Sequence, residues 1–198
     1  MSIYKALNIA LIPGGLEMAA LRQYANKLQT PYWHWHPEAI PHITLWMGIV
    51  KQEDVQTLAK LIRPLFQIGT LQMAGYAVVS NPDSTKNVVS CNVQLSPELF
   101  MLHSKIGKLF GQFRCEVPAR KEMFYGEGIS ESTLHYFSSF SEKHTNSNYS
   151  PHITLGMAES ATLPENSPII SEIALAKAGI YAVSNGCTCV NPQIEFNF

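Results

Sequence analysis

A five-residue phrase occurs twice in this chain, and each copy stands in the same order of predicted elements. Pro-His-Ile-Thr-Leu begins at Pro41 and again at Pro151, about half a chain length later. In each half a strand, a helix, the repeated phrase and a further strand follow one another. The recurrence of a whole neighbourhood predicts an internal duplication with a pseudo-twofold relation, in preference to the chance repetition of five residues.

Hydrophobic periodicity and turn residues give the predicted elements. Helices are expected over 16–29, 51–66 and 97–113, the last with Ser96 as its N-cap and Pro97 at its first position. Strands are expected over 4–12, 41–50, 69–80, 87–95, 151–158, 171–184 and 193–198. Residues 118–150 are rich in Ser, Gly, Asn and aromatic residues, which predicts an irregular insertion. It is either a mobile flap or lid, or an inert surface loop.

Composition limits the classes of protein to which the chain can belong. Of its 198 residues 46% are hydrophobic and 15% are charged, so one domain spanning 1–198 is able to bury a sizeable core. The formal net charge of −1 argues against a protein that grips long nucleic acid, which usually carries a basic excess. No apolar run approaches the roughly 20 residues of a membrane span. We expect a cytoplasmic protein that makes no membrane contact.

Each copy of the phrase places a histidine and a threonine on one face of a strand. Residues i and i+2 of a strand share a face, so His42 lies beside Thr44, and His152 beside Thr154. A pseudo-twofold axis would bring both pairs to one central cleft. Histidine titrates near neutrality, so two of them supply a neutral base and a protonated acid, and threonine hydroxyls can donate to phosphate oxygens. The arrangement predicts acid–base chemistry on a phosphodiester.

A metal site is the main alternative for these histidines. His34 and His36 stand close enough in the sequence to join His42 as ligands. However, no carboxylate or thiolate motif accompanies them, and Cys187-x-Cys189 is a lone pair where a structural zinc site usually needs two. We therefore expect neither a metal nor a cofactor.

Aromatic and basic residues near the motifs are candidates for substrate contacts. Trp46 lies an even number of residues from His42, so an undistorted strand puts it on the same face, where its indole would stack on a base. Tyr149 stands just before the second motif and is a second candidate. Lys143 and His144 could add positive charge beside a phosphate. The aromatic run at 32–36 either stacks on a base or covers the core.

The two quoted motifs, PHITLWMG and PHITLGMA, resemble those of the 2H phosphoesterase superfamily, which includes cyclic phosphodiesterases and 2′-5′ RNA ligase-like proteins. The resemblance extends over most of the chain and rests on the pairing of the motifs. It implies an α+β fold of two lobes related by a pseudo-twofold axis, in which antiparallel sheets line a central cleft and helices lie outside. The length of 118–150 departs from compact members of the family.

The resemblance also implies a function and a site. It implies metal-independent cleavage of 2′,3′-cyclic phosphates or 2′-5′ linkages in small RNA-related molecules, with His42 and His152 as the acid–base pair. Thr44 and Thr154 would bind the phosphate. The expected partner is a small nucleotide or an RNA end, and the expected state is a monomer. A non-catalytic nucleotide- or RNA-binding module and a 2′-5′ RNA ligase remain alternatives, and either histidine can be the base.

Overall fold

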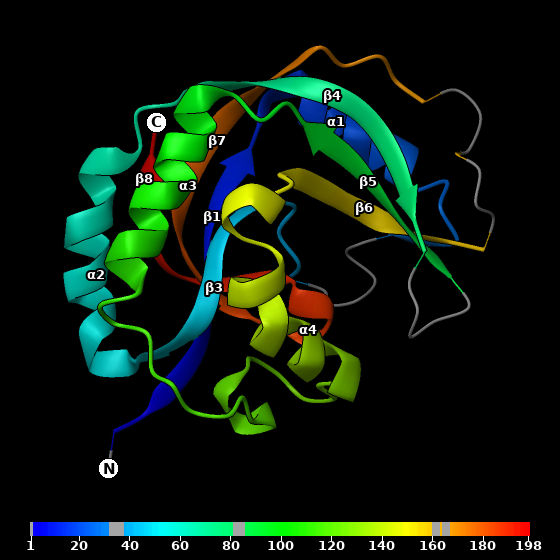
Figure 1. Ribbon diagram of the computed structural model, residues 1–198. Helices are drawn as coiled ribbons and strands as arrows, with labels where there is room; N and C mark the ends of the chain where they lie inside the picture. Colours follow the sequence, from blue (N-terminus) through cyan, green and yellow to red (C-terminus); the bar gives the residue numbers. More distant parts are fainter. Residues whose placement is uncertain (1, 32–37, 81–85, 160–162, 164–166) are drawn as a thin grey trace.

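The computed structural model describes residues 2–31, 38–80, 86–159, 163 and 167–198 (Figure 1). The α-helices are α1 (Gly15–Ala25), α2 (Val55–Ile62), α3 (Pro97–Phe110) and α4 (Glu131–Lys143). The strands are β1 (Tyr4–Pro13), β2 (Thr30–Pro31), β3 (Ile43–Lys51), β4 (Thr70–Val79), β5 (Asn87–Val93), β6 (His152–Ala158), β7 (Glu172–Val183) and β8 (Cys189–Asn197). Within these ranges no helix is long and apolar enough to cross a bilayer.

The strands form two antiparallel groups joined through β7. The order across the sheet is β2-β6-β5-β4-β7-β1-β3, and β8 also pairs with β7. Residues 172–174, the first three of β7, pair with β4. Residues 177–183 pair with β8 along the same edge of β7. One lobe is therefore β3-β1-β7-β8 and the other is β2-β6-β5-β4. The two-lobed α+β fold with antiparallel sheets that was expected from the sequence is confirmed.

Both lobes carry a β-bulge at the same place in the repeated phrase. In β3 the register with β1 skips Leu45, and in β6 the register with β5 skips Leu155. Each skipped leucine directly follows the threonine of its motif, Thr44 or Thr154. A bulge adds one residue to a strand, so the alternation of faces shifts by one beyond it. The shared irregularity supports the predicted duplication, because chance recurrence of five residues gives no reason for matched bulges.

Helices α1, α2 and α3 cover the sheet face that is opposite the histidines. Figure 1 shows α2 and α3 side by side along one flank, and α1 lies against β6 and β7. Ser96 caps α3 as predicted, since its Oγ accepts a hydrogen bond from Leu99 N–H at 3.2 Å. The main core is buried between these helices and the sheet, and its fully buried members include Leu7, Ile9, Leu11, Leu21, Ile43, Leu45, Leu58, Ile62, Val89, Ile106, Phe110 and Ile153.

The insertion 118–150 contains helix α4, which the sequence did not predict. Phe137 and Phe140 of α4 are buried in a second hydrophobic cluster on the histidine-bearing face of the first lobe. The helix begins at an N-cap, Ser130, whose Oγ accepts from Thr133 N–H at 3.2 Å. Asn185 Oδ1 accepts hydrogen bonds from Ser130 N–H at 3.1 Å and from Thr133 Oγ1 at 2.7 Å. Helix α4 is thus anchored on β3 and on the connection between β7 and β8, to which Asn185 belongs. Movement of the segment as a flap or lid stays a prediction.

Candidate functional site

The two histidine–threonine pairs lie on strands that contact each other. His42 immediately precedes β3 and His152 begins β6, and β3 and β6 are in contact although they belong to different lobes. The intervening residues Ile43 and Ile153 are fully buried in the main core. Strand alternation therefore turns both His-x-Thr pairs to the opposite face, away from the covering helices.

Both imidazoles are held by the same local hydrogen bond. His42 Nδ1 lies 2.9 Å from the carbonyl oxygen of Ile40, and His152 Nδ1 lies 2.8 Å from that of Ser150. A carbonyl only accepts, so each Nδ1 carries the hydrogen, and Nε2 is the nitrogen left for proton transfer. In each motif the acceptor is two residues before the histidine. The repeat thus presents the same ring nitrogen of both histidines to a substrate.

Burial separates the two histidines electrostatically. Loss of water around the ring lowers the pKa of His42 to about 4, against the opposing effect of the hydrogen bond to Ile40, and the charge on His152 lowers it further. The field of a charged His152 therefore reaches the ring of His42. His152 itself is partly exposed. The two rings therefore differ in their contact with water, and burial favours the neutral form of His42.

Asn8 is a site residue that the sequence reasoning missed. It lies on β1 and is fully buried, and its Nδ2 lies 2.9 Å from Thr44 Oγ1 and 3.3 Å from His42 Nε2. Because the amide donates to Thr44, the threonine hydroxyl keeps its own hydrogen for a phosphate oxygen. The signal was present in the sequence: Asn8 is the lone amide in the apolar run Ala6–Ile12. A buried polar side chain in such a strand usually has a specific partner.

The second lobe supports its motif with a different pair of residues. Asn92 is opposite His152 and Ser90 is opposite Thr154 in the β5–β6 register. Ser90 Oγ donates to Asn92 Oδ1 at 3.0 Å. The duplicated strands therefore keep the His-x-Thr groups but differ in the polar side chains beside them. This asymmetry gives the two histidines different surroundings.

Trp46 does not follow the simple alternation that the sequence analysis assumed. The bulge at Leu45 shifts the faces, so Trp46 packs against α3, where a Cβ added at Gly107 would meet the indole. Its ring centroid lies 5.3 Å from that of His103 and 6.3 Å from that of Phe140. A stacking contact between Trp46 and a substrate base stays a prediction, and this packing does not favour it.

Tyr149 is buried instead of open to a substrate. It is 6% exposed, and its hydroxyl donates to the carbonyl oxygen of Thr44 at 3.0 Å. Its ring stacks on that of His103, with centroids 3.8 Å apart. Its position favours support of the first motif, while direct substrate binding by Tyr149 stays a prediction.

The end of α4 carries two basic residues, Lys143 and His144, and their place beside a bound phosphate stays a prediction. Burial lowers the pKa of His144, and the charges on His152 and on Lys143 lower it further. His144 also lies beside Tyr136, with ring centroids 4.8 Å apart. The insertion therefore brings a third histidine near the partly exposed His152.

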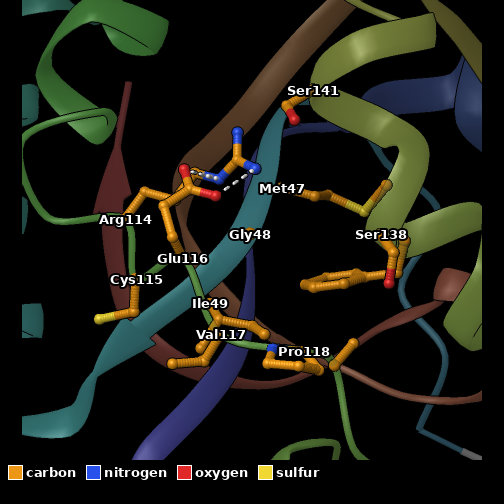
Figure 2. A pocket seen from close by; sticks show the side chains of 12 residues that line it. Met47, Gly48, Ile49, Arg114, Cys115, Glu116, Val117, Pro118, Ser138 and Ser141 are labelled. Carbon is orange, nitrogen blue, oxygen red and sulfur yellow. Dashed lines mark hydrogen bonds and ion pairs between the residues drawn. The ribbon is translucent and has the colours of Figure 1, made fainter.

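Figure 2 shows a pocket of about 330 Å³ that is separate from the two histidines. It lies along β3 between residues 114–119 and α4, and Met47 and Ile49 form its floor. Arg114 and Glu116 form an ion pair at its edge, with Nε and Oε1 3.4 Å apart. Neither His42 nor His152 lines this pocket, so it is not part of the candidate site.

The metal alternative involves residues that the structure does not describe. His34 and His36 lie outside the described residues, as does the whole aromatic run at 32–36. Among the residues that are described, no group of three or more His, Cys, Asp or Glu side chains is placed to hold a metal ion. The absence of a metal from the reaction therefore stays a prediction.

The Asn8 contact gives a direct test of the site electrostatics. We expect Asn8→Asp to increase the proton affinity of His42 roughly tenfold or more, because an opposite charge within about 4–6 Å favours the imidazolium. Histidine ring signals followed by NMR over a pH titration would measure this. The control variant Asn87→Asp makes the same change at the far end of β5. In that variant His42 should titrate as it does in the native protein. An unchanged His42 titration in Asn8→Asp would show that residue 8 does not contact His42 in solution.

Comparisons with known proteins agree with this arrangement. A model of the 2′-5′ RNA ligase superfamily matches residues 16–180. E. coli LigT complexed with ATP is 17% identical with a TM-score of 0.55, and the match covers 98% of both chains. LigT in its apo form is also 17% identical with a TM-score of 0.55, covering 99% of this chain and 98% of that one. A structure described as a phosphoesterase is 18% identical with a TM-score of 0.50 and 98% coverage of both chains. A search of curated proteins found no match.

Proposed function

Because this chain belongs to the 2′-5′ RNA ligase superfamily, we propose that it is a metal-independent phosphodiesterase acting on small RNA-related phosphodiesters. The substrate carries a 2′,3′-cyclic phosphate or a 2′-5′ linkage. The observation that carries the proposal is the matched pair of histidines, each held through Nδ1 by the carbonyl two residues before it. A module that only binds nucleotides has no need of two imidazoles that are oriented in the same way, each with Nδ1 on a carbonyl and Nε2 on the other side of the ring.

The unequal burial of the two histidines supports an assignment of their roles. His42 is neutral, so it accepts a proton at Nε2 from the attacking water. As the water oxygen bonds to phosphorus, the bond from phosphorus to a ribose oxygen breaks, and His152 gives that oxygen its Nε2 proton. The products are a phosphomonoester and a free ribose hydroxyl. The two imidazoles have then exchanged protonation states, and proton exchange with solvent restores them.

The threonines hold the phosphate between the imidazoles. Thr44 Oγ1 accepts from Asn8, which leaves its hydrogen for a non-bridging phosphate oxygen. Thr154 occupies the same place in the second motif and donates from the other lobe. Charge-assisted hydrogen bonds of this kind are stronger than neutral ones. The two threonine hydroxyls therefore stabilise a transition state with two negative charges better than water would.

The chemistry of the site limits the substrate to a small molecule or a chain end. A formal net charge of −1 provides no general attraction for a long polyanion. Any positive charge near the second motif is instead local: the charge of Lys143, the last residue of α4, acts on the neighbouring His144. We therefore propose that a monomer binds one nucleotide or one RNA end.

A 2′-5′ RNA ligase is the second candidate, and the family to which the chain belongs favours it. In ligation a ribose hydroxyl of a second RNA end replaces water as the attacking group on a 2′,3′-cyclic end. The two histidines keep their roles, because one takes the proton of the attacking hydroxyl and the other protonates the ribose oxygen that leaves phosphorus. High concentrations of a hydroxyl-bearing RNA end would reveal this activity in the same preparation.

A substrate panel in the presence of a chelator tests the proposal. We expect hydrolysis of at least one member of a panel of 2′,3′-cyclic mononucleotides, ADP-ribose cyclic phosphate and 2′-5′ oligoadenylates, at a rate that EDTA leaves unchanged. The proposed proton transfers use imidazoles alone, so removal of divalent ions has no step to affect. Activity that EDTA abolishes and a divalent ion restores would contradict the metal-independent mechanism. Binding of panel members without turnover would favour the binding module.

A further inference from the structure

The bulge in β3 exposes two successive carbonyls to side chains from elsewhere in the fold. In a regular strand neighbouring carbonyls point to opposite sides, but a bulge disturbs this pattern. The carbonyl of Thr44 accepts from Tyr149 Oη at 3.0 Å, and that of Leu45 accepts from His103 Nδ1 at 2.9 Å. Both donors come from outside the first lobe's sheet, one from α3 and one from the segment that leads into β6.

The two donors form a single unit. Their rings are stacked, with centroids 3.8 Å apart and planes inclined by 8°. His103 Nε2 accepts a hydrogen bond from Asn146 N–H at 3.2 Å, so both ring nitrogens are engaged and the ring is neutral. Burial lowers the pKa of His103, which agrees with this state. We call Tyr149 and His103 the bracket.

The bracket connects the two motifs through one short segment. Tyr149 donates to Thr44 in the first motif, and the next residue, Ser150, supplies the carbonyl that orients His152 in the second. Residues 146–150 therefore contact both halves of the site. Displacement of this segment would change the position of the first His-x-Thr pair relative to the second.

We infer that Tyr149 and His103 are positioning residues that fix the alignment of the two His-x-Thr motifs across the lobes. The inference rests on the proposed function for its effect on turnover. On this inference the end of the insertion 118–150 holds the site residues in place. Neither a mobile flap nor an inert loop would have that function. It also differs from a substrate contact, since Tyr149 acts through the Thr44 backbone.

Tyr149→Phe tests the inference because it keeps the stacked ring and removes only the hydroxyl donor. We expect kcat to fall about tenfold with KM changed less than threefold, since misalignment of reacting groups acts mainly on the chemical step. Tyr76→Phe is the matched control: Tyr76 Oη also donates to a backbone carbonyl, that of Pro168 at 2.8 Å, but on the helix-covered face. Its kcat should stay within twofold of the native value, although both variants lose a partly buried hydrogen bond to a carbonyl.

A second measurement separates this inference from the proposed function. The ring-proton NMR signals of His42 and His152 report their alignment whether or not the protein turns over a substrate. We expect them to move in Tyr149→Phe and to stay in place in Tyr76→Phe. Absence of turnover by the native protein would refute the proposed function and leave this test intact. Equal behaviour of the two variants in the histidine signals would overturn the positioning role.

Discussion

Replacement of His42 or His152 by asparagine is expected to reduce turnover by about 10²–10⁴-fold, the usual contribution of a general acid or base. Asparagine keeps an N–H near the position of Nδ1, so the hydrogen bond to Ile40 or Ser150 is retained and the fold is disturbed little. What the variant lacks is Nε2, the nitrogen that moves the proton. Steady-state assays with a substrate that the native protein cleaves would measure the loss.

The matched control is His135→Asn on the exposed side of α4, which should keep native turnover. We also expect the native pH–rate curve to be a bell, because one histidine must be neutral and the other protonated. The double variant His42→Asn/His152→Asn should be little slower than either single variant, since the pair acts as a unit. Near-native turnover by a folded single variant would refute the two-histidine mechanism.

His42 is also expected to make the protein less stable as the pH falls below about 6.5. In the unfolded chain a histidine titrates near pH 6.5, whereas burial holds the pKa of His42 in the folded protein at about 4. Protons therefore bind the unfolded state more tightly. The free energy of unfolding should decrease as the pH falls from about 6.5 to about 4, by up to about 3 kcal/mol from this residue.

Urea unfolding at several values of pH would measure this dependence in the native protein and in His42→Asn. Other groups titrate in the same range, including His103, whose pKa is also lowered by burial. The difference between the two proteins isolates the share of His42, since asparagine does not titrate. The native protein should lose more stability than the variant between pH 7 and pH 4.5. Parallel curves would mean that His42 is not desolvated in the folded state.

The sequence was sufficient to predict that each His-x-Thr pair turns to one strand face, because that arrangement is local. A His-x-Thr pair shares a strand face whatever the rest of the fold does, and the repeat of that pair predicted the second lobe. The prediction lost accuracy where a strand departs from regular geometry. The bulge at Leu45 leaves no mark in the residue pattern, so Trp46 was expected on the face of His42 when it packs against α3.

The residues that support the site were harder to predict because their partners are distant in the chain. Asn8 contacts His42 and Thr44 across a strand pair, and Tyr149 contacts Thr44 across the two lobes. Such contacts depend on register and on lobe packing, which a single sequence does not give. Helix α4 was missed for a related reason. Its first half is polar, and it is stabilised by tertiary contacts of Phe137 and Phe140 and not by strong intrinsic propensity.

In the proposed proton-transfer pair His42 is the base and His152 the acid. A 2′,3′-cyclic substrate in which sulfur replaces the leaving oxygen distinguishes the two roles, because a thiolate departs without a proton. With this substrate His152→Asn should regain most of the rate that it lost relative to the native protein, and His42→Asn should regain none. Rescue of His42→Asn instead, or equal behaviour of the two variants, would contradict the assignment.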